Sequence, residues 1–184
     1  MSTEIDVQSL ELLRSLRGAS IDWVAGVRYP GVSGYSEVRL GVAPGATVSL
    51  TLRIADVDDE LEVCVPVVQR ARPFDSGAKV DFFEVGEFRL LSVYMLQRRE
   101  SIDSIDSTAE TPESYQGANP RAQVLSEIDD GDSSSAHVVD AGVSFAGENG
   151  LLLELYADSF PLVFQLTLAI GSSAVPHPKR VKLW

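Results

Sequence analysis

The chain has very few of the residues that build metal centres and nucleophilic active sites. Among its 184 residues there is one cysteine, Cys64, and there are two histidines, His137 and His177. A single cysteine forms no intrachain disulfide, and it cannot complete a zinc site that needs four cysteines or two cysteines with two histidines. Neither histidine stands in the context of a catalytic triad or of an H-E-x-x-H motif. The sequence therefore predicts no catalytic residues, no metal site and no cofactor, and it favours a protein that is not an enzyme.

Loops that bind phosphate groups are also missing. The segments GVSG at 31–34 and GVAPG at 41–45 contain too few glycines, lack a following Lys-Ser or Lys-Thr pair, and precede strands instead of helices. Acidic residues number 27 against 15 basic ones, which gives a net charge of −12. Such a surface repels the phosphate backbone of nucleic acids. We therefore expect no direct nucleic-acid binding, and the acidity either attracts a basic protein partner or serves solubility alone.

The sequence predicts no leader and no membrane span. Residues 1–10, MSTEIDVQSL, have neither the basic nor the apolar region of a secretory signal. The most apolar stretch, GLLLELYADSFPLVFQLTLAIG at 150–171, carries Glu154, Asp158 and a central Pro161. An acidic residue near the middle of a span costs roughly 2.5–3.5 kcal/mol on insertion scales. The sequence thus predicts a cytoplasmic protein without a membrane partner.

The same apolar stretch alternates with the period of a β-strand. Its apolar residues fall on one parity in two runs, Leu151–Leu155 and Leu162–Ile170, and polar residues such as Glu154 and Gln165 fall on the other. Period two is typical of a strand with one buried face. Between the runs, ADSFP at 157–161 supplies turn residues, because Asp and Ser bond their own backbone and Pro fixes φ. Two strands joined by a short corner are predicted.

Residues 3–17 are predicted to form a helix that packs on the sheet. Thr3 and Asp6 match a capping box, and Ser9 is an alternative N-cap that would shorten the helix. Gly18 is placed to end the helix in a left-handed conformation. An approximate helical stripe of apolar residues comprises Ile5, Leu10, Leu13 and Leu16.

Strand signals then recur at intervals of about 10–13 residues, which is typical of a β-meander. We place a first meander over 20–99, with turns at PGVSG, APGA and ADVDDE and a further short strand at 79–83. Pro66 donates no ladder hydrogen bond, so the strand that contains it is expected at an edge. Cys64 alternates with the valines of that strand and is expected to be a structural thiol. Residues 86–99 fit either a strand buried on both faces or a short helix, and their Val, Tyr and Phe content favours the strand.

The rest of the chain divides by composition. Residues 100–137 are rich in acids and Ser and contain few large apolar groups, so they are predicted to be a flexible insertion. Alternation returns over 138–171, with Asn149-Gly150 as a hairpin turn, and predicts a second meander. Residues 172–184 form a basic tail, whose PKRVKL resembles a short nuclear-import signal. We expect one mainly β domain over 1–184: a helix and two antiparallel meanders that share a core.

Two acidic clusters are the candidate sites. One contains Asp56, Asp58, Asp59 and Glu60, followed by Glu62, and the other lies at 129–132. Neither fits the spacing of a Ca²⁺-binding EF-hand loop, so a solvated turn is the alternative to a cation site. We take Asp56, Asp58, Asp59 and Glu60 as the candidate partner-binding residues.

The layout of the chain carries a resemblance. LRGASIDWV, the strands that end in DELEVCV, and DAGVSFAGENGLLLELYADSFPLVFQL resemble small bacterial β-meander proteins, some of which are similar to immunity proteins encoded beside polymorphic toxins. The resemblance implies a binding role and assigns no site residues. Three functions follow as hypotheses: a non-enzymatic module that binds and masks a basic protein, an acidic mimic of nucleic acid that blocks a DNA- or RNA-binding protein, or an enzyme of unrecognised type.

Overall fold

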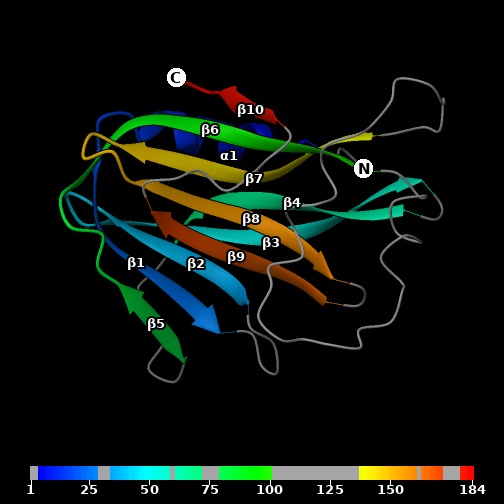
Figure 1. Ribbon diagram of the computed structural model, residues 1–184, viewed down its shortest axis with the longest axis horizontal. Coiled ribbons are helices and arrows are strands. Elements are labelled where there is room, and N and C mark those ends of the chain that lie inside the picture. The colour runs from blue at the N-terminus through cyan, green and yellow to red at the C-terminus, as the bar shows by residue number, and fades with distance from the viewer. Residues whose placement is uncertain are drawn as a thin grey trace.

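Strands dominate the structure, and one helix precedes them. The computed structural model describes residues 4–28, 34–58, 61–71, 79–100, 137–160, 163–171 and 179–184, and within these it contains helix α1 and strands β1 to β10 (Figure 1). The predicted fold class, mainly β with an amino-terminal helix and antiparallel meanders, is confirmed. The predicted insertion over 100–137 lies outside the described residues except for its two ends, which belong to strands.

Helix α1, Val7–Ser15, begins after Asp6, whose side chain caps it. Asp6 Oδ1 accepts a hydrogen bond from the Ser9 backbone N–H at 2.8 Å, and Asp6 Oδ2 accepts one from the Ser9 hydroxyl at 2.7 Å. The predicted helix over 3–17 was too long at both ends, because Asp6 is the N-cap and Leu16 is the C-cap. Gly18 follows with a φ of 71°, the left-handed conformation predicted for it.

The strands pair into two antiparallel runs. The first run has the order β4-β3-β2-β1-β5, from β1 (Ser20–Arg28), β2 (Tyr35–Val42), β3 (Ala46–Asp58), β4 (Leu61–Arg70) and β5 (Val80–Phe83). The second run has the order β9-β8-β7-β6-β10, from β6 (Phe88–Glu100), β7 (His137–Gly147), β8 (Leu152–Phe160), β9 (Val163–Gly171) and β10 (Lys179–Lys182). These pairings correct two predictions. Strand β6, placed in the meander over 20–99, pairs with β7, and the tail over 172–184 contains β10.

Both runs are joined into one system by two short pairings. Tyr35 of β2 pairs with Leu166 of β9, and at the start of β1 Ser20 and Ile21 pair with β6. Together with the β1–β2 pairing, these contacts close a ring of pairings through β1, β2, β9, β8, β7 and β6. The side chains that point into this ring are therefore shielded by strands on all sides, and this is where the main core lies.

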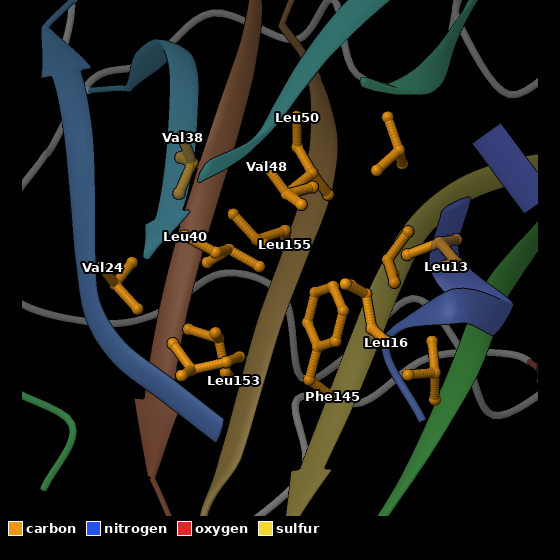
Figure 2. Close-up of a cluster of buried hydrophobic side chains, with 14 of the residues drawn as sticks. Leu13, Leu16, Val24, Val38, Leu40, Val48, Leu50, Phe145, Leu153 and Leu155 are labelled. Atoms are coloured by element: carbon orange, nitrogen blue, oxygen red, sulfur yellow. The ribbon is translucent and has the colours of Figure 1, made fainter. Parts of the chain in front are cut away.

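The main core is apolar and draws on both runs and on α1 (Figure 2). Phe145 and Phe88 are its largest fully buried aromatic side chains. Leu13 of α1 is also fully buried and lies beside β7 in the close-up. The other buried members labelled in Figure 2 are Leu16, Val24, Val38, Leu40, Val48, Leu50, Leu153 and Leu155.

Strand β4 lies at an edge, as Pro66 predicted. Helix α1 lies against that strand, and its Ser9 side chain hydrogen-bonds to the strand's backbone. The Ser9 hydroxyl donates to the Val68 carbonyl at 3.1 Å and accepts from the Val68 backbone N–H at 2.9 Å. A single buried hydroxyl thus satisfies two backbone groups that an edge strand otherwise leaves open.

Irregular register moves some side chains off the faces that simple alternation predicts. Between Ile21 and Trp23 the β1–β2 register shifts by one residue, so Ile21 and Val24 both enter the core while Trp23 turns to the other face. There the indole ring lies directly over Gly41, where any Cβ would overlap it. Glycine is required at that position because the aromatic ring takes the place of a side chain.

The apolar stretch over 150–171 forms β8 and β9, so the prediction of strands is confirmed. Leu153, Leu155 and Leu166 are buried as predicted, whereas Ile170 is 36% exposed, so the buried face stops short of the strand's end. The corner residues 161–162 lie outside the described residues. In the part of the chain that the structure describes, no helix has the length and apolar character to cross a bilayer.

We predict that the Asp6 cap makes the free energy of unfolding decrease as the pH falls into the acidic range. Desolvation raises the pKa of Asp6, but hydrogen bonds from Ser9 and Gln8 outweigh it and hold the pKa below 3.8. A carboxyl with a lowered folded pKa stabilises the fold above its unfolded pKa, and this contribution is lost as pH falls through the folded value. At pH 7, Asp6→Ala should cost about 1 kcal/mol in urea denaturation, and Asp6→Asn, which still caps, should cost little. Unchanged stability of Asp6→Ala at pH 7 would contradict this account.

Leu166 should be among the most sensitive positions, because it is buried in the core and provides the β2–β9 pairing. Leu166→Ala should lower the free energy of unfolding by about 2–5 kcal/mol, since it leaves a cavity. Thr167→Ala, on the opposite and half-buried face of β9, is the matched control and should cost far less. Equal costs in denaturant titrations would show that the register of β9 is wrong.

Candidate protein-binding surface

The predicted acidic cluster lies at the tip of the β3–β4 hairpin. Asp56 and Glu62 are exposed and stand directly opposite each other in the register. Asp58 is the last residue of β3 and pairs with Leu61 across a register shift. Asp59 and Glu60, the other two candidate residues, lie outside the described residues. The described strands thus bring Asp56 together with Glu62, which sequence reasoning had only noted beside the candidate set.

A small apolar cluster supports the base of this tip. Ala55 and Val63 face each other across the hairpin and pack with Val65 of β4 and Val139 of β7. Because Val139 belongs to the second run, the hairpin end is packed against the body of the fold as well as against itself. The acidic residues therefore extend from a supported end of the sheet.

An apolar side chain lies next to the acids. Ile54 shares the parity of the buried Val48 and Leu50, yet it is 47% exposed, because the burial passes to the neighbouring Ala55 at this end of β3. Ile54 and Asp56 are two residues apart on a strand and so share one face. We call Ile54, Asp56 and Glu62 the hairpin-tip surface. An exposed apolar side chain beside charged ones is the arrangement found where an apolar anchor meets a polar rim.

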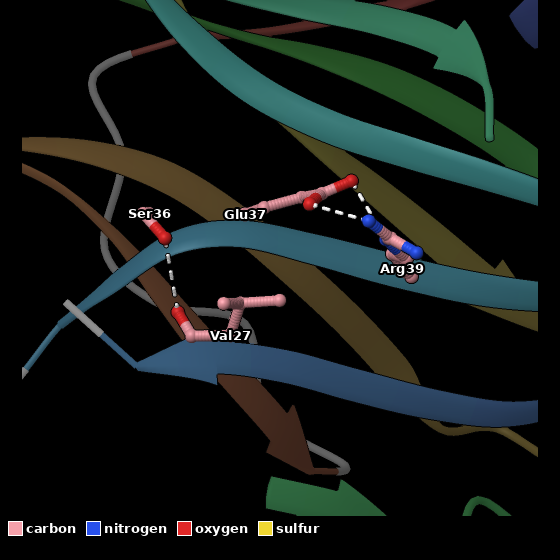
Figure 3. Close-up of polar contacts among 4 residues, drawn as sticks. All are labelled: Val27, Ser36, Glu37 and Arg39. Atoms are coloured by element: carbon pink, nitrogen blue, oxygen red, sulfur yellow. Dashed lines mark hydrogen bonds and ion pairs between the residues drawn. The ribbon is translucent and has the colours of Figure 1, made fainter. Parts of the chain in front are cut away.

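Several acidic side chains elsewhere in the sheets have basic partners close by. Arg39 Nε and Nη2 lie 2.8 and 3.0 Å from the two carboxylate oxygens of Glu37, two residues away on β2, in a bidentate pair (Figure 3). Nearby, the Ser36 hydroxyl donates to the Val27 carbonyl. By sequence, residues 56–62, DVDDELE, contain five acids and no basic residue. Acidic residues are therefore dense in this segment of the chain.

A polar cluster near the β5 end of the first run has a structural role. Arg28 Nη2 lies 2.7 Å from Asp81 Oδ2, and the Tyr35 hydroxyl donates to the same oxygen at 3.3 Å. Desolvation raises the pKa of Tyr35, and the nearby Asp81 charge raises it further. The Tyr35 ring packs edge-on to Phe83, with ring centroids 6.2 Å apart. These contacts tie β1, β2 and β5 together.

The structure describes two of the three residues that were considered for catalysis or metal binding. His137 is half-buried at the start of β7, opposite Glu100, and His177 lies outside the described residues. Cys64 of β4 is buried and is not part of a disulfide. Within the described ranges, no three or more His, Cys, Asp or Glu side chains form a group suited to hold a metal ion.

Sequence reasoning did not find the ion pair that links β8 to the carboxyl-terminal tail. Glu154 of β8, on the face opposite the core, is 1% exposed, and Arg180 of β10 reaches it, with Nη2 2.7 Å from Oε1. The angles depart from those of a linear hydrogen bond, so the contact is foremost one of charge. The available signals were an acid within an apolar strand and a basic tail. Neither signal alone pairs residues 154 and 180.

Comparison with known proteins adds no identification: no protein-family model, no curated protein and no solved structure matches the chain.

Breaking the buried ion pair should cost considerable stability. Arg180→Ala leaves the carboxylate of Glu154 inside the protein without its guanidinium neighbour and should lower the free energy of unfolding by about 3 kcal/mol. Lys182→Ala, an exposed basic position on the same strand, is the matched control and should change stability by less than about 0.5 kcal/mol. The free energies of unfolding of both variants are measured by urea titration. Similar small losses would show that the pair contributes little.

Proposed function

We propose that this protein is a non-enzymatic binding module for a basic protein, and that the hairpin-tip surface makes the contact. The observation that carries the proposal is the pair of opposed exposed acids, Asp56 and Glu62, at a supported hairpin end beside the exposed Ile54, in a sequence segment with three further acids. An immunity-type role, in which the module masks the active surface of a basic partner, fits this arrangement.

The charged and apolar side chains of the hairpin-tip surface contribute to different steps of binding. Exposed charges attract a partner over roughly 8 Å at physiological ionic strength and mainly speed its approach. Apolar side chains that become buried on contact mainly slow dissociation. Asp56 and Glu62 therefore speed association with the partner, and Ile54 slows dissociation.

The alternative role as an acidic mimic of nucleic acid has less support. A mimic presents separate negative charges in a regular array over a rigid face. In the described strands, Glu37, Asp81 and Glu154 each lie within an ion pair with an arginine. A pairing of this kind cancels the charge where a mimic needs it.

The test measures the partner's binding kinetics. Wild-type protein is immobilised and used to isolate its partner from the native host, and association and dissociation rates are then measured with the purified partner. Asp56→Asn with Glu62→Gln should slow association about 3–10-fold at low ionic strength and flatten its salt dependence. Dissociation should change little. The same double variant should keep its free energy of unfolding within about 0.5 kcal/mol, because both residues are exposed.

A matched control separates the site from net charge. Glu84→Gln with Glu87→Gln removes two exposed charges outside the hairpin and should leave both rates nearly unchanged. Ile54→Ser should speed dissociation about tenfold and leave the salt dependence intact. An equal slowing of association by both double variants would mean that the hairpin tip is not the contact site. Isolation of an acidic partner would contradict the proposal as a whole.

A further inference from the structure

The outer part of the β3–β4 hairpin extends beyond the strand that supports its base. Strand β2 pairs with β3 from Ala46 to Leu50, whereas β4 pairs with β3 from Val48 to Asp58. In the described pairings, β3 beyond Leu50 is therefore bonded to β4 alone, and the two strands form a ribbon. Because an isolated two-stranded hairpin is marginally stable in water, the position of this ribbon has to come from other contacts.

Such contacts are made by the residues that precede and begin α1. Arg53 of the ribbon donates from Nη2 to the Glu4 carbonyl at 2.7 Å. The Ser9 hydroxyl bonds both backbone groups of Val68 on β4, at the base of the ribbon. Residues 4–9 therefore contact both strands of the hairpin, one through a main-chain carbonyl and the other through a side chain.

The same segment is fixed to the second run by a buried carboxylate. Asp140 of β7 is 6% exposed, and its Oδ2 accepts a hydrogen bond from the Ile5 backbone N–H at 2.9 Å. Its Oδ1 accepts one from Gln97 Nε2 of β6 at 2.8 Å, which holds the carboxylate in place. The residue before it, Val139, belongs to the apolar cluster under the hairpin tip. Hydrogen bonds to a charged acceptor are stronger than those between neutral groups, so this anchor is a strong one.

We propose that residues 4–9 are a strap that positions the hairpin-tip surface, and that Asp140 is the positioning residue on which the strap depends. The strap links the ribbon to β6 and β7 beside the apolar cluster. Apolar contacts are non-directional, whereas hydrogen bonds fix one orientation. A surface held in one position loses less entropy on binding, so the strap raises affinity without contacting the partner. This role in binding rests on the proposed function, whereas the positioning itself does not.

Distances between two spin labels test the positioning in the full-length protein without a partner. All chains carry Cys64→Ala, and the labels are attached at Glu62→Cys on the hairpin and at Glu148→Cys in the β7–β8 turn, both exposed positions. The distance distribution should be narrow when Asp140 is present. It should broaden or shift in Asp140→Ala, because the Ile5 N–H then loses the carboxylate that anchors the strap.

A rescue variant separates positioning from a general loss of stability. In Asp140→Asn, the new amide oxygen accepts from Ile5 and the amide nitrogen donates to Gln97 once the Gln97 amide has rotated, so the narrow distribution should return. Labels at Glu84→Cys and Glu148→Cys, both outside the hairpin, form the matched control pair and should keep their distance in Asp140→Ala. Broadening of both label pairs would mean that the whole fold loosens, and the proposal would be wrong.

A second variant decides the question if Asp140→Ala does not fold. Arg53→Met removes the bond to the Glu4 carbonyl, keeps an apolar stem of similar length, and should broaden the distribution between the labels at Glu62 and Glu148. An unchanged distribution in Asp140→Ala, or in Arg53→Met if the former does not fold, overturns the proposal.

Binding kinetics separate the strap from the proposed function. With the purified basic partner, Asp140→Ala should raise the dissociation constant about threefold to tenfold, because only part of the population then holds the surface in its binding position. Asp140→Asn should bind like the wild type. If the hairpin distance changes in Asp140→Ala while the dissociation constant does not, the hairpin-tip surface is not the contact site. The strap's role in binding then fails together with the proposed function, and the positioning of the hairpin stands.

Discussion

The fold depends on one constraint. Strands β1 and β2 pair with each other, and each of them pairs along its other edge with two further strands. The edge of β1 that does not pair with β2 pairs with β6 at its start and with β5 further along. The corresponding edge of β2 pairs with β3 and, at Tyr35, with β9. A flat pair of strands cannot meet four neighbours in this way. The ribbon has to twist strongly, and this twist wraps the two runs around a single apolar core.

The irregularities of register follow from that twist. A bulge inserts one extra residue, bends its strand and increases the local twist. Extra residues of this kind lie in β1 after Ile21, in β6 after Leu90, and in β7 opposite Leu96 and Gln97. Each shift also exchanges the faces of the residues beyond it. Past the shift in β1, Val24 is buried although it shares the parity of the exposed Asp22.

Prediction from sequence succeeds where the cause is local. Alternation located the strands, Pro66 located an edge strand, and Gly18 located the end of the helix, because each depends on a few neighbouring residues. The β6–β7 pairing lay beyond such reasoning, because 36 residues outside the described part of the chain separate the two strands. For the candidate site, the sequence indicated the acidic turn. The opposition of Asp56 to Glu62 depends on the hairpin register, and the exposure of Ile54 depends on what the rest of the fold covers.

Charge serves two separate purposes in this molecule, and burial distinguishes them. At Glu154 the carboxylate is withdrawn from water, so its attraction to Arg180 is little screened and fixes where the terminal strand lies. At the hairpin tip the carboxylates face solvent, where salt screens them and their contribution to the fold is small. Asp56 and Glu62 oppose each other there, and like charges in that position repel. The proposed role in binding thus rests on exposed charge, whereas the position of the terminal strand rests on buried charge.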